Sequence, residues 1–369
     1  MRGIYIHVPF CKSKCSYCDF VSYPKQIEKA EAYFACLYKE IRLRGELYKG
    51  KKFDTLYFGG GTPSFVKPEY ILGCVRQVKK YFDLDEAAEI TLELNPGTID
   101  KAKIDTYKKA GINRFSVGLQ SARDDVLADI GRVHDTRDFA RAVKLLSGEN
   151  FSVDVMIGLP NESTADVLRT AEVAVKSGAS HISAYALKAE EGTPMYSRYL
   201  SGELCGEDEI ADSYDALRAY LKQKGFTRYE VSNFCKDGKY SRHNLNYWQR
   251  GEYIGLGVAS SSFMDGRRFA NTSDIDDYVR CILVNRYPEI YSEVIEGEEA
   301  RGEFMMLALR TANGAKDEDY KTAFGRDMRE DYKDAIRKNT SYLDITDDGI
   351  AIKEEYLYVQ NTIIVDFLQ

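Results

Sequence analysis

The sequence predicts an α/β protein whose core is a parallel β-sheet, followed by a smaller region that is mainly helical. Two observations support this fold class. From residue 3 to about residue 232, short β-rich apolar runs alternate with stretches of helical periodicity, and from about residue 274 helical patterns dominate. Strand–helix alternation is typical of βαβ units, which form either an open doubly wound sheet or an incomplete barrel. In both architectures the chemistry lies on loops after the carboxyl ends of the strands.

Six apolar runs in the first region have the length and composition of strands. They are residues 3–9, 53–58, 89–94, 112–117, 152–157 and 180–187. The stretches between them carry apolar side chains at helical spacing, as in the stripe of Ala30, Phe34, Leu37 and Ile41. We therefore predict a barrel-like core domain over residues 1–232.

The remainder divides into a connecting segment and a C-terminal domain. Residues 233–273 are rich in Gly, Asn and Tyr, and residues 274–369 form the predicted C-terminal domain. Within it we expect helices at 275–284, 298–311, 316–323 and 354–368, and strands at 342–346 and 351–353. Helices followed by two strands around the turn Asp347-Asp348-Gly349 predict a winged-helix-like module.

The composition argues against three classes of protein: nucleic-acid binders, membrane-spanning proteins and disulfide-stabilised scaffolds. Lys and Arg number 51 against 58 Asp and Glu, for a net charge of −7 without a long basic block, which argues against a nucleic-acid binder. No apolar run approaches the roughly 18 residues of a membrane span, so we expect a cytoplasmic protein without a transmembrane segment. Eight cysteines in 369 residues are too few for a disulfide scaffold.

Three of the cysteines form a motif directly after the first predicted strand, Cys11-x3-Cys15-x2-Cys18. Three thiolates at this spacing can bind three corners of a 4Fe-4S cluster, which leaves the fourth iron free to bind a small molecule. The alternative is a zinc site that uses His7 or Asp19 as its fourth ligand. The spacing favours iron–sulfur, and its position on a strand-to-helix loop strengthens that interpretation.

Further polar and glycine-rich positions follow the next strands. The loop Gly59-Gly60-Gly61-Thr62-Pro63 ends the second strand, Glu93 lies at the end of the third, Gln120 follows the fourth, and Asp154 lies in the fifth. Any one of them is compatible with a structural hydrogen bond. At successive strands they predict a binding site.

Taken together, four segments resemble the radical S-adenosylmethionine superfamily. They are residues Tyr5 to Phe20 with their cysteine motif, the GGGTP loop, SVGLQS at 116–121 and GLP at 158–160. The similarity points to its anaerobic coproporphyrinogen-oxidase-like branch and covers nearly the whole chain. It implies a partial (β/α)6 TIM-like barrel that holds a 4Fe-4S cluster on Cys11, Cys15 and Cys18. It also implies a set of S-adenosylmethionine contacts: Tyr5, Gly60, Gly61, Thr62, Glu93, Gln120, Arg132 and Asp154.

Two features resemble the heme-chaperone subgroup of that branch. Phe20 stands where coproporphyrinogen oxidases carry a further cysteine, and the run from His243 to Trp248 has the pattern HNxxYW. The resemblance implies heme bound through His243, an apo-hemoprotein acceptor (often a membrane respiratory enzyme) and an electron donor such as flavodoxin. From the residues alone, a histidine beside aromatics is more often a packed, hydrogen-bonded side chain than a ligand.

The alternative function is an oxygen-independent coproporphyrinogen III oxidase, and turnover of S-adenosylmethionine stays open in either case. Many relatives in this branch carry a histidine near Ser260 to Ser262, where this chain has serines.

Overall fold

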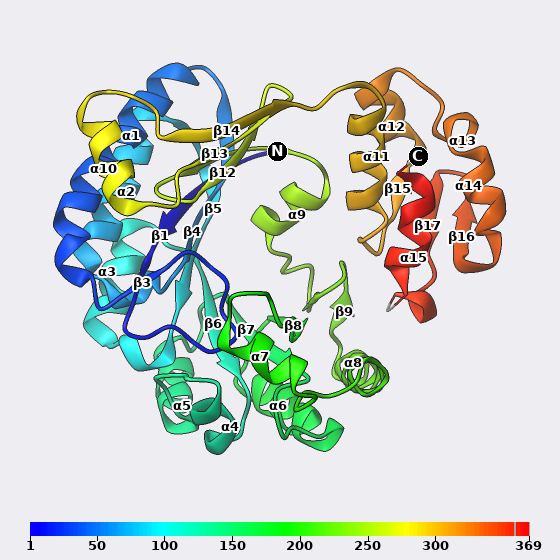
Figure 1. Cartoon of the computed structure of the whole chain (residues 1–369), viewed down its shortest axis with the longest axis horizontal. Coiled ribbons are helices and arrows are strands. Elements are labelled where there is room, and N and C mark those ends of the chain that lie inside the picture. Colours follow the sequence, from blue (N-terminus) through cyan, green and yellow to red (C-terminus); the bar gives the residue numbers. More distant parts are fainter. Residues whose placement is uncertain (358, 369) are drawn as a thin grey trace.

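The computed structural model describes residues 1–357 and 359–368, and in that part of the chain one twelve-stranded sheet forms the framework (Figure 1). The strand order is β14-β13-β12-β11-β1-β4-β5-β6-β7-β8-β10-β9. The central strands are β1 (Arg2–Val8), β4 (Lys52–Gly60), β5 (Asp83–Leu94), β6 (Arg114–Gln120), β7 (Phe151–Ile157) and β8 (His181–Ala186). They pair in parallel as neighbours, so the predicted parallel core is confirmed.

Helices cover the outer face of this curved sheet, as Figure 1 shows. They are α1 (Ala30–Leu47), α2 (Pro68–Tyr81), α3 (Lys101–Ala110), α4 (Asp124–Asp129), α5 (Thr136–Leu145), α6 (Thr164–Lys176) and α8 (Glu207–Gln223), while α7 (Pro194–Leu200) lies against the cysteine loop, where Met195 N donates to the Ser16 carbonyl. The predicted stripe of α1 is buried: Phe34, Leu37 and Ile41 pack in one core with Ile71 and Val75 of α2. This burial drives the helices onto the sheet, because apolar area removed from water is the main favourable term in folding.

The segment 233–273, expected as a connection, adds strands to the sheet. Its elements are β10 (Asn233–Cys235), α9 (Arg242–Trp248), β11 (Glu252–Leu256), β12 (Ser261–Met264) and β13 (Arg267–Asn271), with β9 (Thr227–Arg228) just before it. β11 pairs in parallel with β1, and β12 and β13 follow as antiparallel neighbours. After α10 (Ile275–Leu283), the chain forms β14 (Glu289–Val294), a strand that the sequence did not predict.

The C-terminal module stands beside the barrel, with α11 nearest to it (Figure 1). It contains α11 (Gly297–Ala308), β15 (Ala315–Lys316), α12 (Asp317–Phe324), α13 (Met328–Asp331), α14 (Lys333–Lys338), β16 (Leu343–Thr346), β17 (Gly349–Ile352) and α15 (Gln360–Ile364). A small sheet in the order β15-β17-β16 and a separate apolar core around Met305, Tyr320 and Phe367 agree with the winged-helix-like prediction.

The predicted single helix over 354–368 is wrong. The structure has a 3-10 turn at Glu354–Tyr356, α15, and a second 3-10 turn at Val365–Phe367, while position 358 of the predicted helix lies outside the described residues. Val365 ends a run of four β-branched residues that begins at Thr362, and α15 changes to the second 3-10 turn there, because restricted side chains of this kind lower helix propensity. Among the described residues no helix is long and apolar enough to cross a membrane.

Candidate cofactor site

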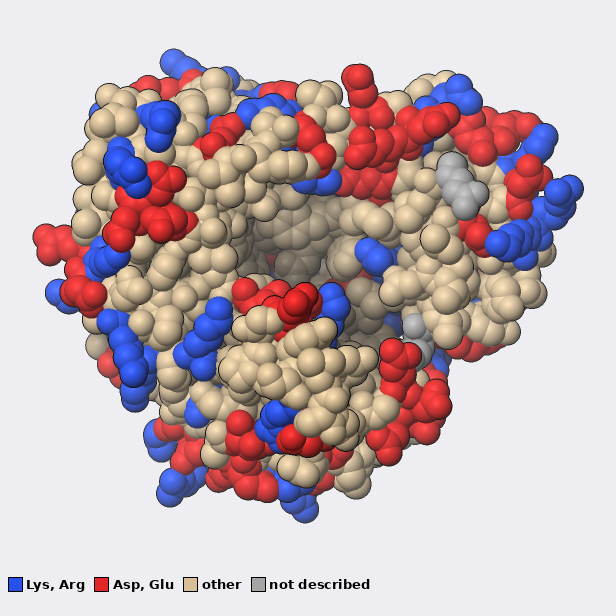
Figure 2. All heavy atoms as spheres, viewed as in Figure 1, with Lys and Arg blue, Asp and Glu red and all other residues tan. Residues whose placement is uncertain are grey.

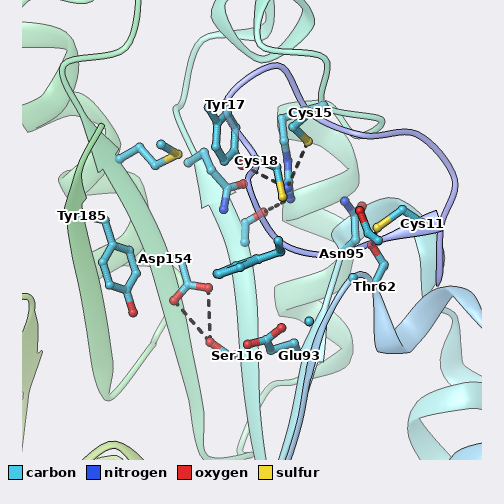
Figure 3. A pocket seen from close by; sticks show the side chains of 18 of the residues that line it. Cys11, Cys15, Tyr17, Cys18, Thr62, Glu93, Asn95, Ser116, Asp154 and Tyr185 are labelled. Atoms are coloured by element: carbon cyan, nitrogen blue, oxygen red, sulfur yellow. Dashed lines mark hydrogen bonds between the residues drawn. The ribbon is translucent and has the colours of Figure 1, made fainter. Parts of the chain in front are cut away.

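A cavity of about 430 Å³, here called the first cavity, lies at the carboxyl ends of the parallel strands. The cysteine-bearing loop forms one wall and side chains from β5, β6 and β7 form the floor (Figure 3). Most of the predicted site residues meet here: Cys11, Cys15, Cys18, Gly60, Gly61, Thr62, Glu93, Gln120, Arg132 and Asp154. This is the edge at which α/β barrels place their chemistry.

The three thiols are held by a loop that is fixed at several points. The Sγ atom of Cys11 lies 3.4 Å from Thr62 Oγ1, and Arg132 Nη1 lies 3.9 Å from Cys15 Sγ. Backbone bonds tie the loop to the barrel, since Ser16 N donates to the Ile130 carbonyl at 3.0 Å. Burial raises the pKa of the Cys11 thiol and raises that of Cys18 to about 11. These two groups are therefore protonated without metal, and metal binding would release their protons.

His7, the predicted alternative zinc ligand, is occupied elsewhere. Its Nε2 atom donates to the Val21 carbonyl at 2.8 Å, which leaves Nδ1 to accept from the Tyr5 hydroxyl at 3.0 Å. Burial lowers the pKa of His7 to about 4, so the ring is neutral at physiological pH. Asp19, the other alternative, lines the first cavity.

In the glycine loop after β4, the backbone lies so close to the neighbouring β1 residues that there is no room for a side chain. Gly60 has φ +107°, and a Cβ atom there would lie 2.4 Å from the His7 ring. A Cβ on Gly61 would lie 2.9 Å from the Val8 carbonyl oxygen, to which the Gly61 N–H donates. Glycine is the residue that permits this geometry. The loop is thereby pinned against the start of the cysteine segment.

Two carboxyl groups form the floor of the first cavity. The Tyr57 hydroxyl donates to Glu93 Oε1 at 2.8 Å, and the Ser116 hydroxyl lies 3.3 Å from both oxygens of Asp154. Burial raises the pKa of Glu93 to about 7. Burial also raises the pKa of Asp154, against the opposing effect of a hydrogen bond from Ser183. A cationic ligand group would favour both carboxylates in their charged form.

Gln120 and Arg132 complete the wall beside the cysteines. The β6–β7 register shifts between Gly118 and Gln120, where Gln120 has φ +63°. Gln120 Oε1 and Arg132 Nε are both buried without a hydrogen-bond partner. Buried polar atoms normally have partners, so this pair favours a polar ligand in the first cavity.

The sequence missed several polar residues that line the first cavity: Tyr17, Tyr57, Asn95, Arg114, Ser116 and Tyr185. One pattern could have found part of this set. Strand side chains alternate in direction, so counting back from Gln120 in steps of two reaches Gly118, Ser116 and Arg114, all of which face the first cavity.

Two predicted residues lie outside the first cavity. Tyr5 lines a different cavity, which His7 also lines. His243 lies on α9 and is only 1% exposed. Its Nδ1 is 2.7 Å from Thr55 Oγ1, its Nε2 is 2.8 Å from the Tyr247 hydroxyl, and its ring stacks on Tyr57 at 5.0 Å. Both ring nitrogens are therefore engaged within the protein.

Comparison with known proteins places this geometry in a family. The model of the radical SAM superfamily matches residues 5–174. Coproporphyrinogen III oxidase from Escherichia coli shares the fold, with a TM-score of 0.87 and 18% identity over 99% of this chain and 89% of that one. The heme chaperone HemW of Mycobacterium tuberculosis is 34% identical over 85% of this chain and 82% of its own. That of Bacillus subtilis is 31% identical over 89% and 88%. The chain belongs to the HemW family.

Membership in the radical SAM superfamily implies a 4Fe-4S cluster and S-adenosylmethionine, and the first cavity of this HemW-family chain suits both. Three thiols line one wall, and unpartnered polar atoms of Gln120 and Arg132 lie beside them. Two of the serines at 260–262 have structural partners: Ser262 Oγ accepts from Gly255 N–H and Ser260 Oγ donates to the Gly257 carbonyl. Ser261 is exposed and does not line the first cavity.

Proposed function

We propose that this chain is a heme chaperone that binds a 4Fe-4S cluster and S-adenosylmethionine in the first cavity and delivers heme to apo-hemoproteins. The observation that carries the proposal is the identity to HemW relatives over more than four fifths of both chains. Phe20 supports it, because a phenylalanine that is 61% exposed stands at the cavity where the alternative function would need another cysteine.

In this proposal Cys11, Cys15 and Cys18 hold three irons of the cluster. When bound, the cluster and S-adenosylmethionine supply one-electron redox chemistry at the cavity wall. Arg132 packs its guanidinium against Cys15 and Tyr17, where its positive charge would partly balance the negative charge of a thiolate-bound cluster. Sequestration behind the loop limits access of water to the thiols, which are only partly exposed.

The remaining residues of the first cavity would bind S-adenosylmethionine. The Gly60–Thr62 loop provides close backbone approach, and the Glu93 carboxylate is placed for a cationic amine. Asp154 on the floor and Gln120 beside the cysteines offer acceptors for hydroxyl groups. Each of these residues acts by binding and orientation.

The partners belong to the same proposal. The acceptor is an apo-hemoprotein such as a membrane respiratory enzyme, the electron donor is of the flavodoxin type, and the protein works in the cytoplasm. The acidic balance of the chain offers no general attraction to anionic lipid, so delivery to a membrane enzyme would run through protein contacts.

Heme titration of the anaerobically purified protein tests the proposal. We expect one heme per chain, followed by heme transfer to an apo-hemoprotein, and no decarboxylation of coproporphyrinogen with S-adenosylmethionine and a reductant. Formation of protoporphyrinogen, or absence of heme binding, would overturn it.

A further inference from the structure

A second cavity of about 670 Å³ lies between the barrel edge and the C-terminal module. Its walls come from β1, β11 and β12 on one side and α11 on the other, with α9 between them. Figure 2 shows the molecule hollowed in this region, between the barrel and the module. The second cavity shares Asp19 and Phe20 with the first cavity, so the two sites adjoin.

Five Tyr and Phe rings take part in the lining of the second cavity. The rings come from the loop after the cysteines, from β1, from α9 and from the sheet extension: Tyr5, Phe20, Tyr247, Tyr253 and Phe263. The volume falls within the range of about 300 to 1,000 Å³ that is usual for small-molecule sites. Aromatic walls offer flat apolar surface, which suits a planar ligand.

Helix α11 forms the opposite wall of the second cavity. One of its faces packs in the core of the C-terminal module and another faces the cavity. Phe304 and Met305 pack in the core of the C-terminal module. Met306 and Leu307, with Glu303 one turn earlier, face the second cavity. The module therefore has a structural role in this site, as one side of the cavity.

A charged group at the cavity wall is only partly neutralised. Arg250 Nε donates to Glu303 Oε2 at 2.8 Å, and Arg268 pairs with the other oxygen of the same carboxylate. The Arg250 guanidinium lies 4.7 Å from the centroid of the Phe263 ring, and its Nη2 atom is buried without a partner. A buried guanidinium nitrogen without an acceptor favours a ligand that carries a carboxylate.

Most side chains that line the cavity and could bind iron are already engaged. The Tyr5 hydroxyl and both His7 nitrogens form hydrogen bonds, and the Tyr247 hydroxyl is bonded to His243. The Tyr253 hydroxyl lines the cavity beside Arg268. Burial has the largest effect on this phenol and raises its pKa, and the charge and hydrogen bond of Arg268 oppose that rise. Met306 also lines the cavity, but its thioether is a softer ligand than a phenolate oxygen, the kind of donor that suits ferric iron.

We propose that the second cavity is the heme site, with the Tyr253 oxygen as an axial ligand of ferric iron and Arg250 bound to a heme propionate. The assignment rests on the proposed function and identifies where the chain would bind heme. Binding forms the iron–oxygen bond and releases the phenolic proton to solvent, without a change of oxidation state. His243 then acts as a positioning residue that holds Tyr247 in the cavity wall through the 2.8 Å bond.

Titration of four anaerobically purified proteins with ferric heme tests the site. The proteins are the wild type, Tyr253→Phe, Ser261→Trp and the control Tyr199→Phe, whose ring is 58% exposed on α7. Tyr253→Phe removes the ligand oxygen, and Ser261→Trp fills the cavity from an exposed position on β12. Iron content of the cluster and binding of S-adenosylmethionine serve as folding controls, because neither side chain lines the first cavity.

We expect Tyr253→Phe to lose the tyrosinate charge-transfer absorption and to bind heme about tenfold more weakly or worse. Ser261→Trp should weaken heme binding to a similar degree, while Tyr199→Phe should match the wild type. Unchanged binding by Ser261→Trp would overturn the site and leave the proposed function intact. A Tyr253→Phe spectrum identical to the wild type would overturn the ligand assignment. A wild type that binds no heme would overturn both proposals.

Discussion

The hydroxyl of Tyr57 donates a 2.8 Å hydrogen bond to Glu93 at the floor of the first cavity. Burial pushes the pKa of Glu93 up to about 7, and this hydrogen bond opposes the rise by favouring the charged form. The carboxyl is therefore poised to change its charge near neutral pH. Below its pKa it is neutral, and above its pKa it is an anion.

Binding of S-adenosylmethionine should consequently depend on pH. If the Glu93 carboxylate binds the ligand amine, the dissociation constant measured by calorimetry on the cluster-loaded protein should decrease between about pH 6 and about pH 8. Tyr57→Phe should move the midpoint upward, because it removes a bond that lowers the pKa. Glu93→Gln should bind weakly at every pH, and a pH-independent wild type would contradict this role.

The cysteine assignment predicts a selective loss of iron. Replacing Cys11, Cys15 or Cys18 singly by Ser should sharply reduce iron and sulfide content and the brown colour after anaerobic reconstitution. Cys205→Ser is the matched control, since that thiol is also partly exposed but lies outside the first cavity. Equal iron content in the motif variants and the control would refute the ligand set.

The glycine loop predicts a large effect from one methyl group. Gly60→Ala forces a Cβ into the His7 ring at a positive φ angle, so the free energy of unfolding should fall by about 2 to 3 kcal/mol. Gly206→Ala is the control, because nothing lies within 4 Å of its added Cβ and its φ is −69°. Urea denaturation measures both, and similar stabilities of the two variants would show that the loop relaxes.

His243 is expected to matter for stability more than for heme. His243→Ala leaves Thr55 and Tyr247 without a partner and opens a void against Tyr57, which should cost about 2 to 4 kcal/mol of unfolding free energy. In the fraction that stays folded, heme titration should still reach one heme per chain, because the proposed ligand is Tyr253. Loss of all heme binding from a folded His243→Ala protein would return the ligand role to this histidine.

The sequence predicts the core strands well because their signal is local. Most of the parallel strands contain a short run rich in apolar residues, such as Phe53 to Phe58, because most of their residues are buried. β14 escaped prediction because most of its residues are exposed, so its pairing with β13 leaves little pattern in the sequence. The C-terminal helix was predicted too long, because apolar residues continue through the segments where the structure has 3-10 turns.

The candidate site was predictable in composition but only partly in geometry. The cysteines, Glu93 and Asp154 follow from motif and strand position, and they meet in one cavity. The placement of His243 could not be predicted, because its partner Thr55 lies 188 residues away in the chain. Contacts of that kind depend on how α9 packs against β4, which periodicity does not encode.

Heme transfer tests the proposed function most directly. The heme-loaded, cluster-containing protein is mixed with an apo-hemoprotein under anaerobic conditions, and the acceptor spectrum is followed against a control in which free heme is added. We predict that heme passes from this chain to the acceptor while the cluster stays intact, and that coproporphyrinogen is not decarboxylated. Heme that stays bound to the chain, or decarboxylation of coproporphyrinogen by the same preparation, would contradict the assignment as a heme chaperone.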